Sequence, residues 1–274
     1  MPAAISRPTL TIFAAICSFS ILPSPALATD PASVTLTGGL QSEIGCASDF
    51  QPSCAASALV FDSGNQVWQR TFTIPAGDFQ YFAALNGSFA ETYGLNGGNA
   101  FTPVSLSLSS STPVSFYYDN VTHWLTDNVN TSIAVLAGSF QSEIGCASDF
   151  APGCLRSWLQ DPNGDGISTL TLSLPAGNYS TVIAINESFG QTYGLNGTSG
   201  GANIDFTAGS SPVLFSYNNL SHILTIDNGL SSAVPEPGTW ALMLVGFAAI
   251  GLSARRRRKL GWASSDWISA TTSN

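Results

Sequence analysis

Apolar and polar residues alternate along several short segments in the middle of the chain. A period of two is typical of a half-buried β-strand, whose successive side chains face opposite sides of a sheet. The pattern predicts strands at 34–37, 67–74, 104–108, 114–118 and 169–174. Turn residues separate them at 62–65, 75–77, 96–97 and 161–166. Because no segment between 30 and 230 combines a helical period with capping residues, the sequence predicts an all-β region.

The alternating pattern occurs twice, because the middle of the chain is a duplication. The stretch QSEIGCASDF stands at 41–50 and again at 141–150, and other segments repeat at an offset of 99 or 100 residues. A repeat of this length fits a whole domain better than a solenoid unit. We therefore expect two tandem modules, residues 33–129 and 133–229, each an immunoglobulin-like antiparallel β-sandwich.

Each predicted module contains two cysteines with seven residues between them, whereas Cys17 lies near the N-terminus. An even number of cysteines in an exported chain favours disulfides. The symmetry of the duplication favours pairing within each module over crossed pairing: Cys46 with Cys54, and Cys146 with Cys154. A metal site is the alternative, but no histidine lies near either pair and the spacing suits no common zinc motif. We predict no metal.

Two acidic residues of the repeated decapeptide, Glu43 and Asp49, recur as Glu143 and Asp149. Calcium prefers oxygen ligands, so a calcium role is conceivable, but hydrogen bonding of the loop by the carboxylates is favoured. The turn at 161–166 begins like an EF-hand loop, yet Leu172 stands where the bidentate Glu belongs, which favours a tight turn.

The charge of the chain is strongly acidic between residues 30 and 234. Fifteen acidic residues stand there against two arginines, a formal charge of −13. Such a surface repels phosphate backbones, so we expect no nucleic acid partner. Acidity of this degree is typical of a soluble exported protein, but it does not select a ligand.

The N-terminal residues 1–28 have the features of a secretory signal peptide. One arginine precedes an apolar core, and a small-residue motif ends at Ala28. An N-terminal membrane anchor is the alternative, but the apolar run is short of the roughly 18 residues that a spanning helix needs.

The C-terminal segment 234–259 combines Pro235, Glu236 and Pro237 with Trp240, an uncharged stretch and a basic cluster that begins with Arg255, Arg256, Arg257 and Arg258. The uncharged residues 238–254 are just long enough for a transmembrane helix, and the basic cluster is expected on the cytoplasmic side. These residues resemble the PEP-CTERM sorting signal of Gram-negative bacteria that produce exopolysaccharides. The resemblance implies an exosortase-type enzyme as partner, and delivery to the cell surface or extracellular matrix. An ordinary C-terminal anchor is the alternative, and the tail 260–274 departs from the usual signal.

The first module carries a series of ordered motifs: LQSEIGC at 40–46, VWQ at 67–69, IPAG at 74–77, FYYD at 116–119 and THWLTDN at 122–128. In this order they resemble the non-catalytic X-25 type β-sandwich that accompanies bacterial pullulanases and amylopullulanases. The second module matches more loosely. The resemblance implies an immunoglobulin-like fold and association with α-glucans such as starch or pullulan.

Binding of a sugar needs exposed aromatic faces beside polar groups that hold hydroxyls. The candidates in the first module are Trp68, Phe89, Tyr93 and Trp124, with Asn86 and His123 as polar partners; for each aromatic, a place in the core is the alternative. Module two has Ser168 opposite Trp68 and Ile223 opposite Trp124, so the first module is the expected binding site.

Catalytic motifs are missing from the sequence. It shows no serine-hydrolase elbow and no His–Cys dyad, and Glu91 and Asp119 become Gln191 and Asn218 in the second module. We therefore predict a non-enzymatic protein without cofactor. Two functions remain: binding of an α-glucan or exopolysaccharide at the cell surface, or a structural and adhesive role in the matrix without a specific glucan site.

Overall fold

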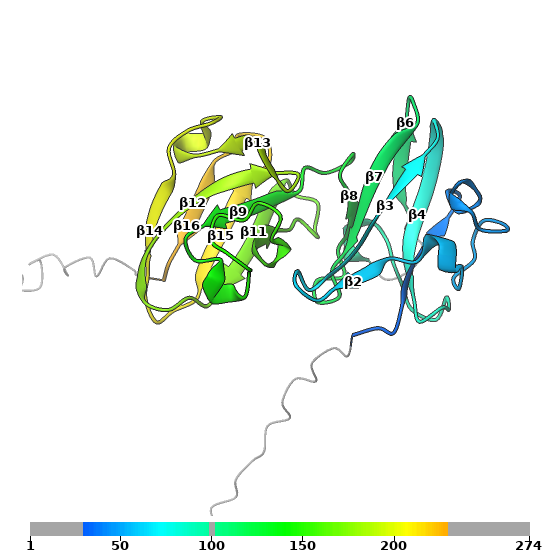
Figure 1. Ribbon diagram of the computed structural model, residues 1–274, viewed down its shortest axis with the longest axis horizontal. Coiled ribbons are helices and arrows are strands. Elements are labelled where there is room, and N and C mark those ends of the chain that lie inside the picture. Colours follow the sequence, from blue (N-terminus) through cyan, green and yellow to red (C-terminus); the bar gives the residue numbers. More distant parts are fainter. Residues whose placement is uncertain (1–29, 99–101, 230–274) are drawn as a thin grey trace, which may run out of the picture. The chain divides into compact units, whose positions relative to one another are not determined.

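Eight strands, β1 to β8, form the first part of the computed structural model, which describes residues 30–98 and 102–229 (Figure 1). Three-residue 3-10 helices lie between some of them: η1 (Ser42–Ile44), η2 (Ala55–Ser57) and η3 (Leu95–Gly97). We refer to this part as module one. Its strands are β1 (Val34–Gly38), β2 (Val60–Asp62), β3 (Val67–Ile74), β4 (Gly77–Leu85), β5 (Thr92–Tyr93), β6 (Val104–Leu108), β7 (Thr112–Tyr118) and β8 (Leu125–Asp127).

Eight further strands, β9 to β16, form module two, again with three 3-10 helices: η4 (Ser142–Ile144), η5 (Leu155–Ser157) and η6 (Leu195–Gly197). Its strands are β9 (Ala134–Gly138), β10 (Trp158–Leu159), β11 (Ile167–Leu172), β12 (Gly177–Ile185), β13 (Ser188–Tyr193), β14 (Ile204–Ala208), β15 (Val213–Asn218) and β16 (Leu224–Asp227).

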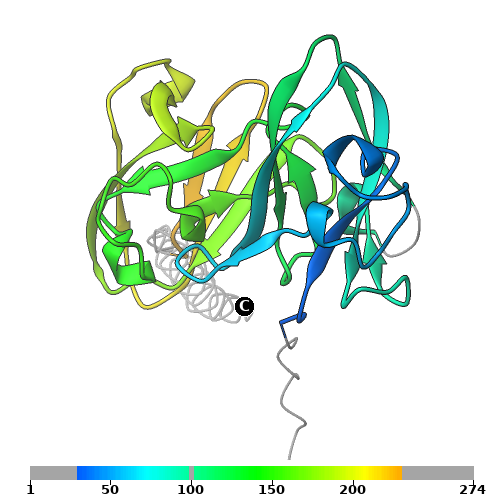
Figure 2. The same cartoon turned by 45° about the vertical axis from the view of Figure 1, so that its right-hand side comes forward.

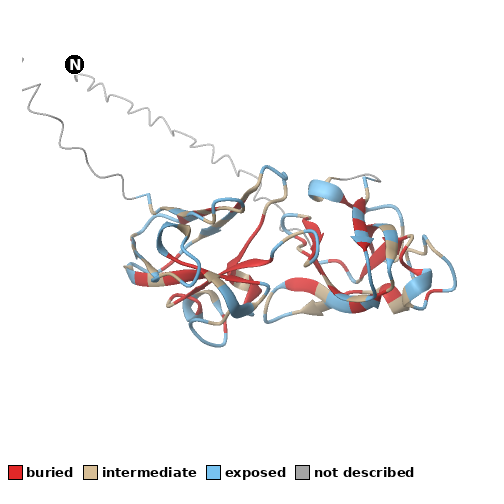
Figure 3. Ribbon diagram, turned by 90° about the horizontal axis from the view of Figure 1, so that it is seen from above, coloured by how far each residue is buried: buried red, intermediate tan, exposed pale blue. Residues whose placement is uncertain are grey.

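Each module is a pair of antiparallel sheets packed face to face, as Figures 1 and 2 show. In module one, β4 lies between β1 on one side and β5 and β6 on the other, and this sheet covers a second sheet of order β2-β3-β7-β8. Module two repeats the plan around β12, over a sheet of order β11-β15-β16. The apolar core lies between the sheets, where Figure 3 shows the buried residues along the strands. The prediction of an all-β fold is confirmed.

The alternation of apolar and polar residues located some strands well and others not at all. The predicted ranges 67–74 and 104–108 coincide with β3 and β6, and 169–174 is shifted by two residues from β11. The pattern missed β4 and β12, the central strands of their sheets, because their last five residues are all buried. There the outer face of the sheet is covered as well, so the period of two disappears.

The repeated decapeptide holds a surface loop in the same way in both modules. The fully buried side chain of Gln41 accepts a hydrogen bond from the Gln51 amide (2.7 Å) and donates to the Gln51 carbonyl and the Ser57 hydroxyl (both 2.8 Å). Asp49 Oδ1 accepts from the amide and hydroxyl of Ser42. Gln141 and Asp149 do the same in module two. The decapeptide therefore has a structural role. Its aspartates hold the loop by hydrogen bonds, which is the interpretation favoured over a calcium site in the sequence analysis.

The four predicted cysteine partners form two disulfides, Cys46–Cys54 and Cys146–Cys154. Each bond closes the decapeptide loop of its own module, so the prediction of pairing within the modules is confirmed. Closing so small a loop contributes on the order of 2–3 kcal/mol by restricting the unfolded chain.

A buried tyrosine and carboxyl group anchor the connection between the modules. Asp127 is fully buried, and its Oδ2 accepts hydrogen bonds from the hydroxyl of Tyr81 (2.6 Å) and from Nδ2 of Asn130 (2.7 Å). Its Oδ1 accepts from the amides of Val129 and Asn130. Because these bonds fix the first residues after β8, the chain leaves module one in a defined direction.

The two modules share a small apolar cluster. Val67, Tyr117 and Trp124 of module one pack in it against four residues of module two: Ile133, Val135, Leu155 and Trp158. The rings of Trp124 and Trp158 stack with centroids 4.9 Å apart. We refer to this cluster and the hydrogen bonds around it as the junction.

Hydrogen bonds surround the apolar cluster of the junction. The Tyr117 hydroxyl donates to Glu187 (2.6 Å), and Gln160 links to both Thr122 (2.6 Å) and Asp119 (2.7 Å). Arg156 Nε donates to a backbone carbonyl in the loop after β2 (2.6 Å). Burial raises the pKa of the Glu187 carboxyl, although its hydrogen bond with Tyr117 acts in the opposite direction. The junction therefore fixes the modules against each other by packing and by directional bonds.

The two copies differ at several residues of the junction. Leu155, Arg156 and Trp158 of module two stand at the positions of Ala55, Ala56 and Ala58 in module one. Conversely, Tyr117 and Trp124 of module one correspond to Ser216 and Ile223. We refer to each of these two sets of large junction residues as a docking end. Each module therefore carries one docking end, and other residues stand at the positions of the second.

Tyrosine burial predicts how the protein responds to alkali. Burial, with nearby acidic groups as a smaller cause, raises the pKa of Tyr93 to about 12, and burial also raises the pKa of Tyr81, Tyr118 and Tyr217. Since phenols of the unfolded chain titrate near pH 10, this stability is fully present below about pH 10 and is lost as the pH rises through the folded values. The phenolate absorbance of these four tyrosines and the near-ultraviolet circular dichroism should therefore change together, well above pH 10. Ionisation of these four phenols near pH 10 with unchanged dichroism would contradict the expectation.

The predicted signal peptide, sorting signal and transmembrane helix lie outside the described residues. Within 30–98 and 102–229, no helix is long and apolar enough to cross a membrane. The membrane-spanning part of the predicted fold class thus stays a prediction.

Candidate functional site

Two of the predicted sugar-binding aromatics are buried. Trp68 has 8% of its surface exposed and packs against Phe61, with ring centroids 5.3 Å apart, in the core of module one. Trp124 is 5% exposed and belongs to the junction, where Trp158 covers its ring. Stacking on a sugar needs an open face, which neither ring offers. The structure gives both tryptophans a packing role, the alternative considered for them.

Tyr93 and His123 do lie together, as a stacked pair. Their ring centroids are 3.9 Å apart and their planes differ by 2°. The Tyr118 hydroxyl lies 3.0 Å from Nδ1 of His123, and the Tyr93 hydroxyl donates to Glu91 (2.8 Å). His123 has a φ of +58°, a left-handed conformation that these contacts hold in place. Tyr93 is buried, so this pair is not an open platform.

The remaining two predicted residues lie near the surface. Asn86 accepts a hydrogen bond from the Ala32 amide through Oδ1 (2.7 Å) and so ties the first described residues to β4. Phe89 is 40% exposed and lies 6.1 Å from the ring of Phe82. Among the aromatics predicted to bind sugar, Phe89 alone keeps an exposed side.

Sequence reasoning missed the most exposed aromatic residue of this region. Phe50, the last residue of the repeated decapeptide, is 57% exposed, has a φ of +57° and lies 6.5 Å from Phe82 on the side away from the core. Phe150 occupies the same place in module two, with a φ of +49°. The signal that could have revealed it is the unchanged repetition of a large apolar residue at the tip of a polar loop.

Phe50 borders a groove on the outer face of module one, which we refer to as the outer groove. The groove has a volume of about 440 Å³ and runs over the antiparallel pair of β4 and β6. Its outward side chains are polar, and Ser107 donates to Asp78 Oδ1 across the strands (2.6 Å). Beside this pair lie Gln80 and Ser105, which are also exposed.

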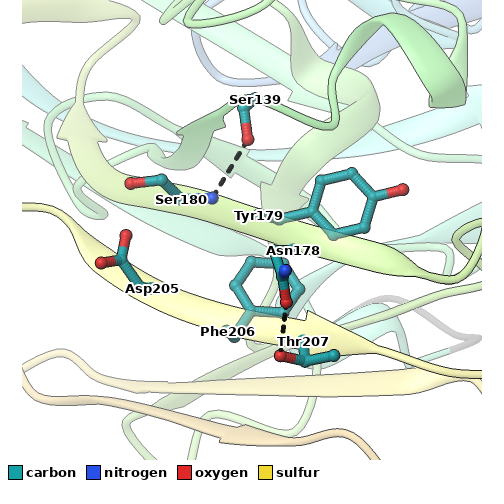
Figure 4. Close-up of a pocket in the computed structure, with 7 residues that line it drawn as sticks. All are labelled: Ser139, Asn178, Tyr179, Ser180, Asp205, Phe206 and Thr207. Atoms are coloured by element: carbon teal, nitrogen blue, oxygen red, sulfur yellow. Dashed lines mark hydrogen bonds between the residues drawn. The ribbon is translucent and has the colours of Figure 1, made fainter.

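The outer groove recurs at the same place in module two, over β12 and β14, with a volume of about 390 Å³ (Figure 4). Here Thr207 donates to Oδ1 of Asn178 across the strands (2.9 Å), and Ser139 Oγ accepts from the Ser180 amide (3.0 Å). Asp205 stands where module one has Ser105. Carboxylate, amide and hydroxyl groups thus line both grooves.

The outer groove has the chemical groups that are suited to binding a carbohydrate. Carboxylates, amides and hydroxyls can exchange hydrogen bonds with the hydroxyls of a sugar. An exposed phenylalanine beside them offers apolar area for the sugar's C–H groups. Among the described residues, no group of three or more histidine, cysteine or acidic side chains is placed to hold a metal ion.

Comparison with known proteins identifies both modules. The family model described as "Pullulanase X25 domain" matches residues 33–125 and 133–224. The chain belongs to the pullulanase X25 domain family. Both X25 copies are matched, so the resemblance of module two, looser in sequence, is confirmed together with that of module one.

Two amylopullulanases are similar to this X25 chain. The protein from Thermoanaerobacter thermohydrosulfuricus is 29% identical over 208 residues, which cover 73% of this chain and 14% of the relative. The protein from Thermoanaerobacterium saccharolyticum is 30% identical over 193 residues, covering 64% of this chain and 15% of the relative. The X25 chain thus corresponds to a small part of these proteins.

A solved structure, "Pullulanase from Bacillus acidopullulyticus", aligns with 72% of this X25 chain and 28% of its own length, at 17% identity and a TM-score of 0.34. At its C-terminus the X25 chain also matches the PEP-CTERM protein-sorting motif over residues 233–258. The predicted resemblance to a PEP-CTERM signal is confirmed.

Proposed function

We propose that this protein is an exported, surface-sorted and non-catalytic protein whose tandem X25 modules bind an α-glucan-type polysaccharide. The observation that carries the proposal is the outer groove, whose polar lining occurs in both modules and which the exposed Phe50 borders in module one. The family assignment supports the ligand class, because the similar relatives are amylopullulanases. The sorting motif supports export and processing by an exosortase-type enzyme, and residues 1–28 would direct secretion.

The proposed binding surface differs from the one expected from sequence. It consists of the outer groove with Phe50 in module one and of the corresponding groove in module two. Phe89, Phe150 and Phe189 are also exposed, and we propose that they extend the two surfaces. Since each module has a groove, a long polymer can occupy both, and two linked weak sites bind more tightly than either alone.

Affinity electrophoresis tests this function. Residues 29–234 contain every strand that the structure describes, and we expect pullulan or amylopectin in the gel to retard them. Replacing both Phe50 and Phe89 by alanine should weaken the retardation because the apolar face is lost. Leu220→Ala is the matched control, since Leu220 is exposed but lies outside both grooves. Unchanged mobility of the parent protein in both gels would argue for the structural or adhesive matrix role instead.

A further inference from the structure

An aromatic pair of module one is replaced by two polar residues in module two. In module one, Phe61 and Trp68 are register partners on β2 and β3, and their rings pack 5.3 Å apart. The bridge between Gln160 and Thr169 gives module two the same register, which places Asp161 opposite Ser168. Two large rings are thus exchanged for two small polar side chains at the edge of the core.

A cavity of about 320 Å³ lies beside this exchange in module two. Its wall includes Asp161, the buried rings of Tyr193 and Tyr217, and residues 130–132 of the connection between the modules. A space of this volume has the size of a small-molecule site, large enough for one or two sugar rings.

The polar side of the cavity is held rigid. His222 lies against Tyr193 with centroids 3.7 Å apart, and its Nδ1 lies 2.7 Å from the Tyr217 hydroxyl. It keeps a φ of +60°, a conformation that costs free energy outside glycine and is therefore maintained by these contacts. Asn130, which also lines the cavity, is fixed by the buried carboxyl of Asp127. The site is preorganised, which lowers the entropic cost of binding.

Three side chains that line the cavity each have a hydrogen-bonding atom without a partner among the described residues. Gln191 donates through Nε2 to Tyr193 and leaves its Oε1 without a partner among the described residues. Asn219 accepts from Ser168 through Oδ1 and, within the same part of the chain, leaves Nδ2 unbonded. His222 engages Nδ1 and retains Nε2. One acceptor, one donor and one imidazole nitrogen are therefore available to a ligand.

We propose that this cavity is a second binding site, specific to module two, for a short neutral saccharide of one or two rings. Hydroxyl groups match a mixed set of donors and acceptors, whereas an anion would meet the strongly acidic chain. A cation is disfavoured because both oxygens of Asp161 already accept backbone amides, those of Asp165 and Gly166. The ligand class rests on the proposed glucan function, and the chain end of an α-glucan is the expected occupant.

Calorimetry with glucose, maltose, maltotriose and galactose tests the cavity. Residues 29–234 should bind at least one of these sugars. The double change Asp161→Phe with Ser168→Trp, which restores the aromatic pair of module one, should abolish binding. Gln191→Leu is a milder second variant on an exposed side chain, and the loss of the Oε1 acceptor should weaken binding about tenfold. Val121→Ala is the control, because Val121 is exposed and lines neither the cavity nor an outer groove, and this variant should bind the small sugar normally.

The outcomes separate this site from the glucan function. The cavity proposal is overturned if the parent protein binds none of the four sugars. It is also overturned if the Asp161→Phe/Ser168→Trp and Gln191→Leu variants both bind as well as the parent. Retardation in the pullulan gel then still supports the outer groove. If a sugar binds in the cavity but the gel shows no retardation, the cavity stands and the glucan function fails.

Discussion

Replacement of Trp158 by alanine is expected to lower the free energy of unfolding by about 3–5 kcal/mol, as for other large core truncations. The ring of Trp158 is 1% exposed and packs against Trp124 and Tyr117 across the junction, so its removal leaves a cavity there. Denaturant unfolding of residues 29–234, followed by circular dichroism, measures the loss. Because the junction couples the modules, the single transition of the parent should separate into two.

Trp158→Phe is the matched control for this change. The buried indole Nε1 of Trp158 has no hydrogen-bond partner in the described residues, so phenylalanine removes an unsatisfied donor while retaining an aromatic ring. Its loss should be far smaller than that of the alanine variant. A loss below about 1 kcal/mol for Trp158→Ala, with one transition preserved, would show that the coupling of the modules does not depend on Trp158.

Removal of the buried carboxyl group by Asp127→Ala should cost about 3–5 kcal/mol, because several buried donors lose their acceptor at about 1–3 kcal/mol each. The change leaves the fully buried hydroxyl of Tyr81 without an acceptor and releases the amides of Val129 and Asn130. The same measurement of unfolding applies. Loss of the anchored connection should also weaken the coupling of the two modules.

The duplication supplies a control for this prediction. Asp227, the counterpart of Asp127, is exposed and accepts one backbone hydrogen bond, from Gly229 (3.0 Å). Asp227→Ala should therefore change stability by no more than about 0.5–1 kcal/mol. If Asp127→Ala does not fold, Tyr81→Phe removes a single bond and should cost about 1–2 kcal/mol. Equal losses for Asp127→Ala and Asp227→Ala would contradict the structural argument.

Local sequence pattern was sufficient for part of the fold. The period of two located β3 and β6 because one face of each strand is buried and the other meets solvent. It failed for β4 because the loop that carries Phe50 also covers the outer face, next to Phe82. Coverage by a distant loop is a tertiary property, and a window of neighbouring residues contains no information about it.

The candidate site was harder to predict than the fold. Aromatic residue type alone does not distinguish a packing role from a binding role, so Trp68 and Trp124 were chosen although both are buried. Comparison of the two copies contains more information. Trp124 changes to Ile223 because the junction needs the ring on one side only, whereas Phe50 recurs unchanged as Phe150 and is exposed in both modules.

The one-sided junction limits how this gene can change in length. A third copy inserted after module two would meet Ser216 and Ile223 where docking needs Tyr117 and Trp124. Recombination within the repeated decapeptide would leave one hybrid module that begins with the first copy and exposes Leu155 and Trp158 to solvent. Addition or loss of a copy thus leaves an apolar docking end without its partner, and copy number becomes subject to selection through the stability of the protein.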